Sequence, residues 1–184
     1  TPIPGMGVEV EFKPGPIVAH PIRSRAQVEK LRVPDPRESV PYVFEILRRL
    51  RRELEAEQVP LLGFAGAPFT LAAYLVEGKG SKDFAALKRL MYCEPGVLRA
   101  LLERLTEMTV AYLNAQIEAG AQAVQLFDTW AGLLSAADYR EWILPTHQTI
   151  ARRLNRAAAP LILYVNGGAH VLDAMADSGG DVLS

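Results

Sequence analysis

The segment LLGFAGAPFTLAAYLVEG, residues 61–78, combines two patterns that together indicate the fold class. It opens within an apolar run, VPLLGF at 59–64, which is too short for a helix and is bounded by proline and glycine, so it predicts a buried strand. The glycines of GFAG and Pro68 then break the run, and apolar residues resume at helical spacing from Thr70. The segment therefore predicts a strand, a turn of small residues and a helix that carries Tyr74.

The same alternation of strand and helix recurs along the chain. Periodic apolar residues predict further helices at about 41–57, from near Ser81, from about 94 to Gly120, from Ser135 with a break at Pro145, and at about 169–178. Further apolar runs predict strands at 123–128, 160–165 and 181–184. These runs are continuous, which is typical of a parallel sheet that is covered on both faces or closed into a barrel. Four such strands make half of a (β/α)8 barrel or most of a doubly wound sheet, and periodicity leaves both open.

Residues 1–38 differ from the rest, because proline and glycine are frequent and no long periodic pattern appears. We expect an irregular segment there, with a short strand or hairpin at 8–12 and one short helix at 24–31 that Pro34 and Pro36 end. The chain reads as a single partial domain over 1–184. Because the first residue is Thr and the last four residues look like a strand cut short, we expect a fragment of a longer protein.

Composition excludes several classes of protein. Twenty basic residues against 21 acidic ones give a formal net charge of -1, which predicts no bulk attraction to nucleic acid or to a membrane surface. The arginine run at 48–53 alternates with Glu45, Glu53 and Glu55 at helical spacing, which predicts a solvated helix face. No apolar run approaches the roughly 20 residues of a membrane helix. The one cysteine, Cys93, is interpreted as a small buried residue and favours a reducing compartment, the cytoplasm.

Ligands of parallel α/β folds bind at the carboxyl ends of the strands, so the candidate site residues follow the apolar runs. These segments are Ala65 to Tyr74, Asp128 to Gly132, Asn166 to His170, and Ser184. None of them carries a phosphate loop, a dinucleotide motif or a nucleophile elbow. The three histidines, His20, His147 and His170, stand far apart and are interpreted as structural or surface residues. The pattern predicts no metal site.

A more specific observation is a resemblance to a known family. GFAGAPFTLAAYLVEG at 63–78 resembles the signature of uroporphyrinogen decarboxylases, and LFDTWAG at 126–132 is similar to a second segment of that family. LYVNGGAH at 163–170, SGGDVLS at 178–184 and the N-terminal TPIPGMGVEVEF lie where related segments belong. The resemblance covers the whole chain. It implies a (β/α)8 TIM barrel of which strands three to six and their helices are present.

The resemblance also implies a function. The family removes the four acetate carboxyl groups of uroporphyrinogen III to give coproporphyrinogen III in heme and tetrapyrrole biosynthesis, without metal or organic cofactor. Two residues match substrate-contacting positions of the family, Tyr74 and Thr129, whose hydroxyls can donate to the acetate or propionate carboxylates. Asp128 is a candidate supporting acceptor, and Phe69, Phe127 and Trp130 are expected in wall and core. The family forms homodimers.

The resemblance assigns no catalytic residue within this chain, because it implies that the family's Arg-rich motif and its aspartate belong upstream of Thr1 and its histidine downstream of Ser184. We therefore expect residues 1–184 alone to be inactive and unstable. One alternative is a zinc-dependent corrinoid or thiol methyltransferase of the same superfamily, which places a His-x-Cys pair where this chain has Tyr164 to Asn166. The other is a non-catalytic relative that only binds tetrapyrrole.

Overall fold

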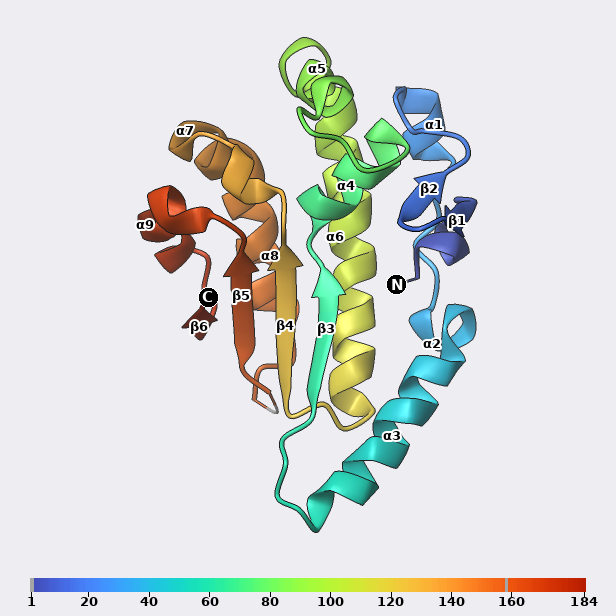
Figure 1. The fold of residues 1–184 in the computed structure, drawn as a ribbon, viewed down its shortest axis with the longest axis vertical. Helices are drawn as coiled ribbons and strands as arrows, with labels where there is room; N and C mark the ends of the chain where they lie inside the picture. The colour runs from blue at the N-terminus through green and yellow to red at the C-terminus, as the bar shows by residue number, and fades with distance from the viewer. Residues whose placement is uncertain (1, 158) are drawn as a thin grey trace.

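The structure is a computed structural model that describes residues 2–157 and 159–184, with helices packed against one side of a parallel sheet (Figure 1). The main sheet has the order β3-β4-β5-β6 and consists of β3 (Leu62–Gly66), β4 (Ala123–Asp128), β5 (Leu161–Val165) and β6 (Val182–Leu183). The α-helices are α1 (Arg25–Glu29), α2 (Pro36–Ser39), α3 (Pro41–Glu55), α4 (Pro68–Glu77), α5 (Ala85–Cys93), α6 (Pro95–Glu118), α7 (Ala136–Asp138), α8 (Leu144–Arg153) and α9 (Leu172–Ala176). Among the described residues, none of these helices has the length and apolar content needed to span a membrane.

All neighbouring strands of the main sheet run parallel, as the sequence predicts. Leu126 is the central residue of the pairing, opposite Ala65 on β3 and Leu163 on β5. Since the strands share one direction, their carboxyl ends meet at one edge, and α4 and the segments that lead into α7 and α9 begin there (Figure 1). The α/β class is therefore confirmed.

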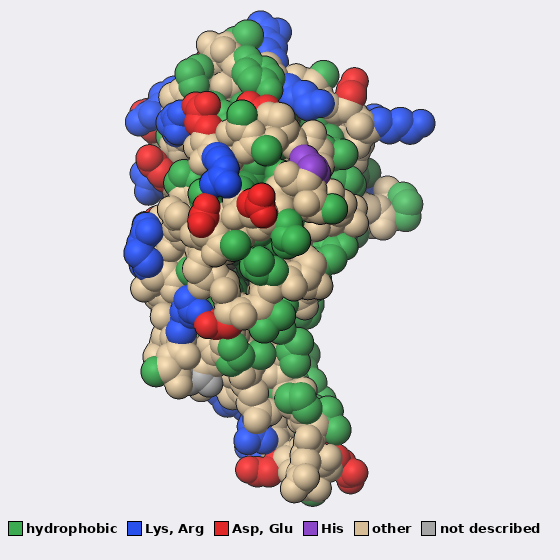
Figure 2. All heavy atoms as spheres, turned by 90° about the vertical axis from the view of Figure 1, so that its left-hand side faces the viewer, with side chains coloured by type: hydrophobic (Ala, Val, Ile, Leu, Met, Phe, Trp, Pro, Cys, Tyr) green, Lys and Arg blue, Asp and Glu red, His purple; other side chains and the backbone are tan. Residues whose placement is uncertain are grey.

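The two faces of the sheet have different surroundings. On β4 burial alternates, with Val124, Leu126 and Asp128 fully buried on the face that α6 and α8 cover. The opposite face is open within this chain, and Phe64 is 61% exposed on it. Figure 2, seen from the β6 side, shows apolar side chains gathered along the right-hand edge of the molecule, over the strands. One covered face and one open face are what half of a closed barrel would present.

An aromatic row crosses the open face. The rings of Phe64 on β3, Phe127 on β4 and Tyr164 on β5 meet edge to face, with 5.7 Å between the centroids of each neighbouring pair. Edge-to-face geometry brings the positive ring edge against the negative ring face, and each such pair contributes about 0.5–1.5 kcal/mol beyond burial. The row therefore ties three strands together on a face that none of the helices in the described residues covers.

The free edge of β3 is closed by a side chain. Gln116 of α6 is 2% exposed, its Nε2 donates to the carbonyl of Phe64 at 2.9 Å, and its Oε1 accepts from the amide of Phe64 at 2.9 Å. Gly63 makes this approach possible, because a Cβ there would lie 2.7 Å from Gln116 Oε1. A small residue in the signature segment thus serves close packing between strand and helix.

The N-terminal segment forms the expected hairpin and short helix. β1 (Val10–Phe12) pairs antiparallel with β2 (Pro16–Val18), after a 3-10 turn, η1 (Ile3–Met6). Ser24 caps α1 by accepting from the amide of Gln27. The helix ends at Glu29 without a proline, and Pro36 instead begins α2, so the predicted role of Pro34 and Pro36 as breakers is wrong. Proline is favoured at the first position of a helix because that amide has no intrahelical partner.

The prediction of the first strand is also wrong in position. β3 is Leu62–Gly66 rather than 59–64, because Pro60 lies before it and the glycines pair with β4 instead of forming the turn. Consequently α4 begins at Pro68 rather than Thr70. Helix α5 begins at Ala85 rather than near Ser81, because Ser81 accepts from the amide of Phe84 in a turn that precedes the helix.

The longer helices agree with their predictions. α3 and α6 begin and end within about two residues of the expected positions, and Arg49 and Arg51 pair with Glu53 and Glu55 on the solvated face of α3. The break at Pro145 is confirmed, since a π-helical turn, η3 (Tyr139–Ile143), separates α7 from α8. Pro145 supplies no amide to the preceding turn, which leaves room for this wider geometry.

Candidate functional site

The loop after β3 carries Tyr74 to the carboxyl edge of the sheet. The amide of Ala67 donates to the carbonyl of Phe127 at 2.7 Å, which attaches the start of α4 to the end of β4. Thr70 and Tyr74 are four residues apart and share one face of α4. The half-buried Tyr74 ring meets the Trp130 ring edge to face, with 6.1 Å between the centroids.

The loop after β4 carries Thr129 to the same edge. Thr129 is half-buried and is followed directly by Trp130, whose ring lies between Tyr74 and the buried Phe84 of the α4–α5 connection, at 4.9 Å from Phe84. The structure therefore brings the segments of the two sequence-predicted substrate contacts, Tyr74 and Thr129, together around one indole ring.

The loops after β4 and β5 are in direct contact. An added Cβ on Gly132 would lie 2.0 Å from the carbonyl oxygen of Asn166, so only glycine fits between the two backbones. His170 Nε2 donates to the carbonyl of Leu134 at 2.8 Å and joins the same two loops further along. The third predicted segment, Asn166 to His170, is thus packed against the second.

Four buried side chains form a hydrogen-bonded cluster beneath these loops, which we call the Asp128 cluster: Thr70, Asp128, Tyr139 and His147. Asp128 accepts from the hydroxyl of Thr70 at 2.7 Å through Oδ1, and its Oδ2 lies 3.0 Å from His147 Nε2. His147 Nδ1 lies 3.1 Å from the hydroxyl of Tyr139. Asp128 and Tyr139 are 0% exposed and His147 is 1% exposed, so every partner in the cluster comes from the protein.

The cluster has one consistent assignment of protons. Burial, reinforced by the negative charge of Asp128, raises the pKa of Tyr139, so its hydroxyl stays protonated and donates to His147 Nδ1. His147 Nε2 then carries the proton that it donates to Asp128. The amide of Trp130 in turn donates to the oxygen of Thr70 at 3.2 Å, which connects the cluster to the loop that holds Thr129.

Sequence reasoning placed Asp128 and missed its partner. Along β4, Phe127 lies on the open side, whereas Asp128 faces the helices, as the alternation of a strand requires. That parity was a usable signal that Asp128 needs a buried partner. His147 is buried with both ring nitrogens hydrogen-bonded, and His20 and His170 are exposed, so their interpretation as structural or surface residues stays a prediction that fits these positions.

The predictions for the remaining aromatic residues are confirmed, whereas the prediction for Cys93 is not. Phe69 is buried in the core, and Phe127 and Trp130 line the open face and the edge loops, as expected of wall and core residues. The prediction that Cys93 is buried is wrong: Cys93 ends α5 and is exposed, because the helix turns its last residue toward solvent. Among the described residues, no group of three metal-ligating side chains comes together.

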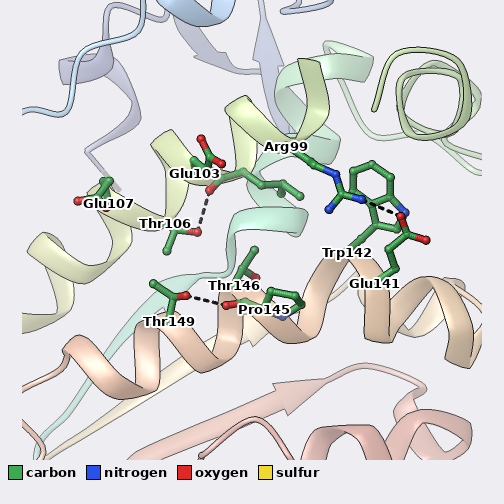
Figure 3. Close-up of a pocket in the computed structure, with 10 residues that line it drawn as sticks. Arg99, Glu103, Thr106, Glu107, Glu141, Trp142, Pro145, Thr146 and Thr149 are labelled. Carbon is green, nitrogen blue, oxygen red and sulfur yellow. Dashed lines mark hydrogen bonds and ion pairs between the residues drawn. The ribbon is translucent and has the colours of Figure 1, made fainter. Parts of the chain in front are cut away.

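A groove between α6 and the η3–α8 segment lies away from the strand ends (Figure 3). Arg99 stacks over the Trp142 ring at 4.3 Å and pairs with Glu141 at 2.7 Å. The hydroxyl of Thr146 donates to the carbonyl of Ile143 in η3, and that of Thr149 to the carbonyl of Pro145 in α8. Because these polar groups already have partners within the protein, we interpret the groove as a gap between packed helices and not as a binding site.

A parallel sheet with hydroxyl, carboxyl and aromatic side chains gathered at its carboxyl edge is the arrangement of an α/β protein that binds its ligand at the strand ends. The sequence pattern of the family described as uroporphyrinogen decarboxylase (URO-D) matches residues 1–184. The chain belongs to the uroporphyrinogen decarboxylase family.

The chain is similar to uroporphyrinogen decarboxylases of Geobacter sulfurreducens and Geotalea daltonii, with 53% and 54% identity over 183 residues. The alignments cover 100% of this chain and 54% of each relative, so the chain spans about half the length of the curated relatives it matches. A solved methyltransferase from Methanosarcina mazei superposes with a TM-score of 0.82 at 26% identity, over 99% of this chain and 53% of that structure.

Proposed function

We propose that the protein containing this chain is a uroporphyrinogen decarboxylase, which converts uroporphyrinogen III to coproporphyrinogen III by removing four acetate carboxyl groups in heme and tetrapyrrole biosynthesis. The observation that carries the proposal is identity of 53–54% along the chain to enzymes of that name. The packing of Tyr74 against the loop that holds Thr129 supports it, because both hydroxyls come from the segments that resemble the family.

The reaction needs no cofactor, because the substrate accepts its own electrons. When a pyrrole carbon takes up a proton, the ring becomes an iminium. The bond between the acetate methylene and its carboxyl carbon then breaks, carbon dioxide leaves, and the electron pair moves into the iminium. A second proton converts the exocyclic methylene to a methyl group, and the ring carbon releases the first proton, which restores the pyrrole, so that each decarboxylation takes up one proton net and releases one carbon dioxide. The protein has to bind a polyanion, keep it oriented and stabilise the developing charge.

Tyr74 and Thr129 fit the binding part of this task. A phenol and an alcohol hydroxyl each donate to carboxylate without adding charge, and both are half-buried, where a hydrogen bond to an anion is stronger than in water. The aromatic row of the open face and the Trp130 ring offer flat apolar surface to a macrocycle. No residue of this chain is assigned to the proton transfers.

The finer architecture is part of the same proposal. We take 1–184 as one partial domain, with 1–38 as its irregular segment, and the four parallel strands as strands three to six of a (β/α)8 TIM barrel. The open face with the exposed Phe64 and Leu62 supports this arrangement, since barrel closure would bury it. A cytoplasmic location and a homodimer of the full-length protein complete the proposal, without nucleic acid or membrane as partner.

The structural similarity to a methyltransferase favours a second candidate, a zinc-dependent corrinoid or thiol methyltransferase. Thiolate and imidazole are the ligands that hold such a zinc, whereas Tyr164, Val165 and Asn166 stand at the matching strand end. Identity is also lower, 26% against 53–54% for the decarboxylases. The decarboxylase is therefore the better supported candidate.

The test uses the full-length protein and uroporphyrinogen III under anaerobic conditions, with products separated by chromatography and bound zinc measured in parallel. We expect coproporphyrinogen III in the wild type and a weaker affinity in Tyr74→Phe, by roughly tenfold for one hydrogen bond to a charged group. Tyr42→Phe, at an exposed tyrosine of α3, is the matched control. No product from the wild type would refute the proposal, and stoichiometric zinc with methyl transfer would support the second candidate.

A further inference from the structure

The Asp128 cluster lies between the two segments that carry the proposed substrate contacts. Thr70 is on α4, one helical turn before Tyr74, and its hydroxyl donates to Asp128 at the end of β4. The same hydroxyl oxygen accepts from the amide of Trp130, the residue after Thr129. One side chain therefore holds both α4 and the loop after β4.

We infer that Thr70, held by Asp128 and His147, is a positioning residue that fixes the spacing between the hydroxyls of Tyr74 and Thr129. This inference rests on the proposed function, because the two hydroxyls matter only if they bind the carboxylates of one substrate. It adds a role for three buried residues that do not themselves touch substrate.

The orientation of each group in the cluster depends on the next one. His147 comes from α8 and Tyr139 from the π-helical turn before it, so the helix layer determines where the Asp128 carboxylate points. Asp128 Oδ2 is occupied by His147, which leaves Oδ1 for Thr70. Thr70 then donates its hydroxyl hydrogen to Asp128, and its oxygen accepts a hydrogen bond from the amide of Trp130. Its threonine methyl is buried as well, since the residue is 6% exposed.

A simpler interpretation is that the cluster only stabilises the fold. The two interpretations predict different kinetics. Loss of stability lowers the amount of active enzyme, so the apparent kcat falls and KM stays the same. A changed spacing of two groups that bind ground state and transition state alike raises KM and leaves kcat nearly unchanged.

The experiment compares Thr70→Val, which keeps the shape and removes the hydroxyl, with Thr70→Ser, which keeps the hydroxyl, in the full-length protein. We expect Thr70→Val to raise KM for uroporphyrinogen III by about tenfold, since small displacements of positioning groups cost one to two orders of magnitude. We expect kcat within about twofold of the wild type, and Thr70→Ser to restore KM. In a Tyr74→Phe background the effect of Thr70→Val should shrink, because contacting groups are not additive.

Thr106→Val is the matched control, because Thr106 is 5% exposed and its hydroxyl donates to the carbonyl of Leu102 within the same helix, α6. It should leave KM at the wild-type value. A Thr70→Val enzyme with unchanged KM, or a Thr106→Val enzyme with the same rise in KM, would overturn the inference.

A second measurement needs no substrate and separates this inference from the proposed function. Hydrogen exchange at the amide of Trp130 should be slow in the wild type and in Thr70→Ser, and fast in Thr70→Val. Equal protection in all three proteins would overturn the inference even if the wild type makes coproporphyrinogen. If Thr70→Val alone loses protection, the hydrogen bond of Thr70 that joins α4 to the loop after β4 is supported. That conclusion holds even if the wild type makes no coproporphyrinogen, in which case only the proposed function fails.

Discussion

Replacing Gly132 with alanine should separate the loops after β4 and β5. The added Cβ would lie 2.0 Å from the carbonyl oxygen of Asn166 and 3.1 Å from its carbonyl carbon. Both of these are backbone atoms, so no side chain can rotate away to make room. Real Cβ contacts lie at 3.0 Å or more, and the two backbones must therefore move apart by at least 1.0 Å, the difference between 3.0 and 2.0 Å.

The size of the effect follows from that displacement. Overpacking that forces backbone shifts costs about 1–3 kcal/mol, and we expect the upper end, about 3 kcal/mol, because the contact is backbone to backbone. Thr129 lies on the displaced loop, three residues before Gly132. A shift of about 1 Å at a positioning loop lowers kcat/KM by about 100-fold.

Urea unfolding of the full-length protein and steady-state decarboxylation together measure both effects. The matched control is Gly96→Ala in the first turn of α6, where an added Cβ meets nothing within 4 Å. That substitution should be neutral or stabilise by about 0.4–1 kcal/mol, since alanine restricts the unfolded chain. If Gly132→Ala unfolded at the same urea concentration as Gly96→Ala and retained normal kcat/KM, the close approach of the two loops would be wrong.

Two further predictions concern stability. Gln116→Leu should destabilise by about 2–4 kcal/mol, because it leaves both backbone groups of Phe64 without their partner at about 1–3 kcal/mol each, whereas Glu103→Leu, at an exposed residue of the same helix, should change unfolding by less than about 1 kcal/mol. The amide of Leu161 donates to Asp181 at 2.7 Å, and this bond, with Arg156 adding to it, holds the pKa of Asp181 below its ordinary value. A lowered carboxyl pKa stabilises the fold above the unfolded pKa of about 3.9, and this stability is lost as pH falls through the lower folded value. Unfolding free energies measured between pH 7 and pH 2 should therefore fall less steeply in acid for Asp181→Asn than for the wild type, and parallel curves would contradict the assignment.

The helices were predictable because their signals are local. The apolar spacing of α3 and α6 recurs every three or four residues over 15 and 24 residues, and a proline stands at the first position of each. β4 was predicted at the residues where it occurs, since a capping glycine precedes its apolar run and Asp128 ends it.

The bounds of β3 were predicted wrongly, because glycine occurs both in turns that end strands and at close contacts within strands. Glycine breaks strands in solvent-exposed turns, but in β3 it allows α6 to approach, and that use depends on Gln116, more than 50 residues away in the sequence. No local pattern distinguishes the two uses. The exposure of Cys93 likewise depends on how α5 is oriented on the fold.

The candidate site was predictable in its outline and not in its connections. Strand ends identify Tyr74, Thr129 and Asp128 by position along the chain. The link from Asp128 to His147 spans 19 residues and a π-helical turn, which shifts the side chains of the following helix relative to a regular α-helix. Only the three-dimensional structure joins them.

The amide side chain of Gln116 has a consequence for any strand added beside β3. The residues of β3 that point to this edge are Leu62, Phe64 and Gly66, since Leu61 and Ala67 bond toward β4. With Phe64 already occupied, an incoming strand finds an interrupted ladder and has to bulge or stop at the middle of the edge. A foreign strand in arbitrary register is thereby disfavoured, which protects the edge against aggregation. A neighbouring strand of the same protein would need a bulge or an end opposite Phe64, where Gln116 already occupies both backbone groups. Gln116 therefore restricts which strand can pair with β3 as well as covering the middle of its edge.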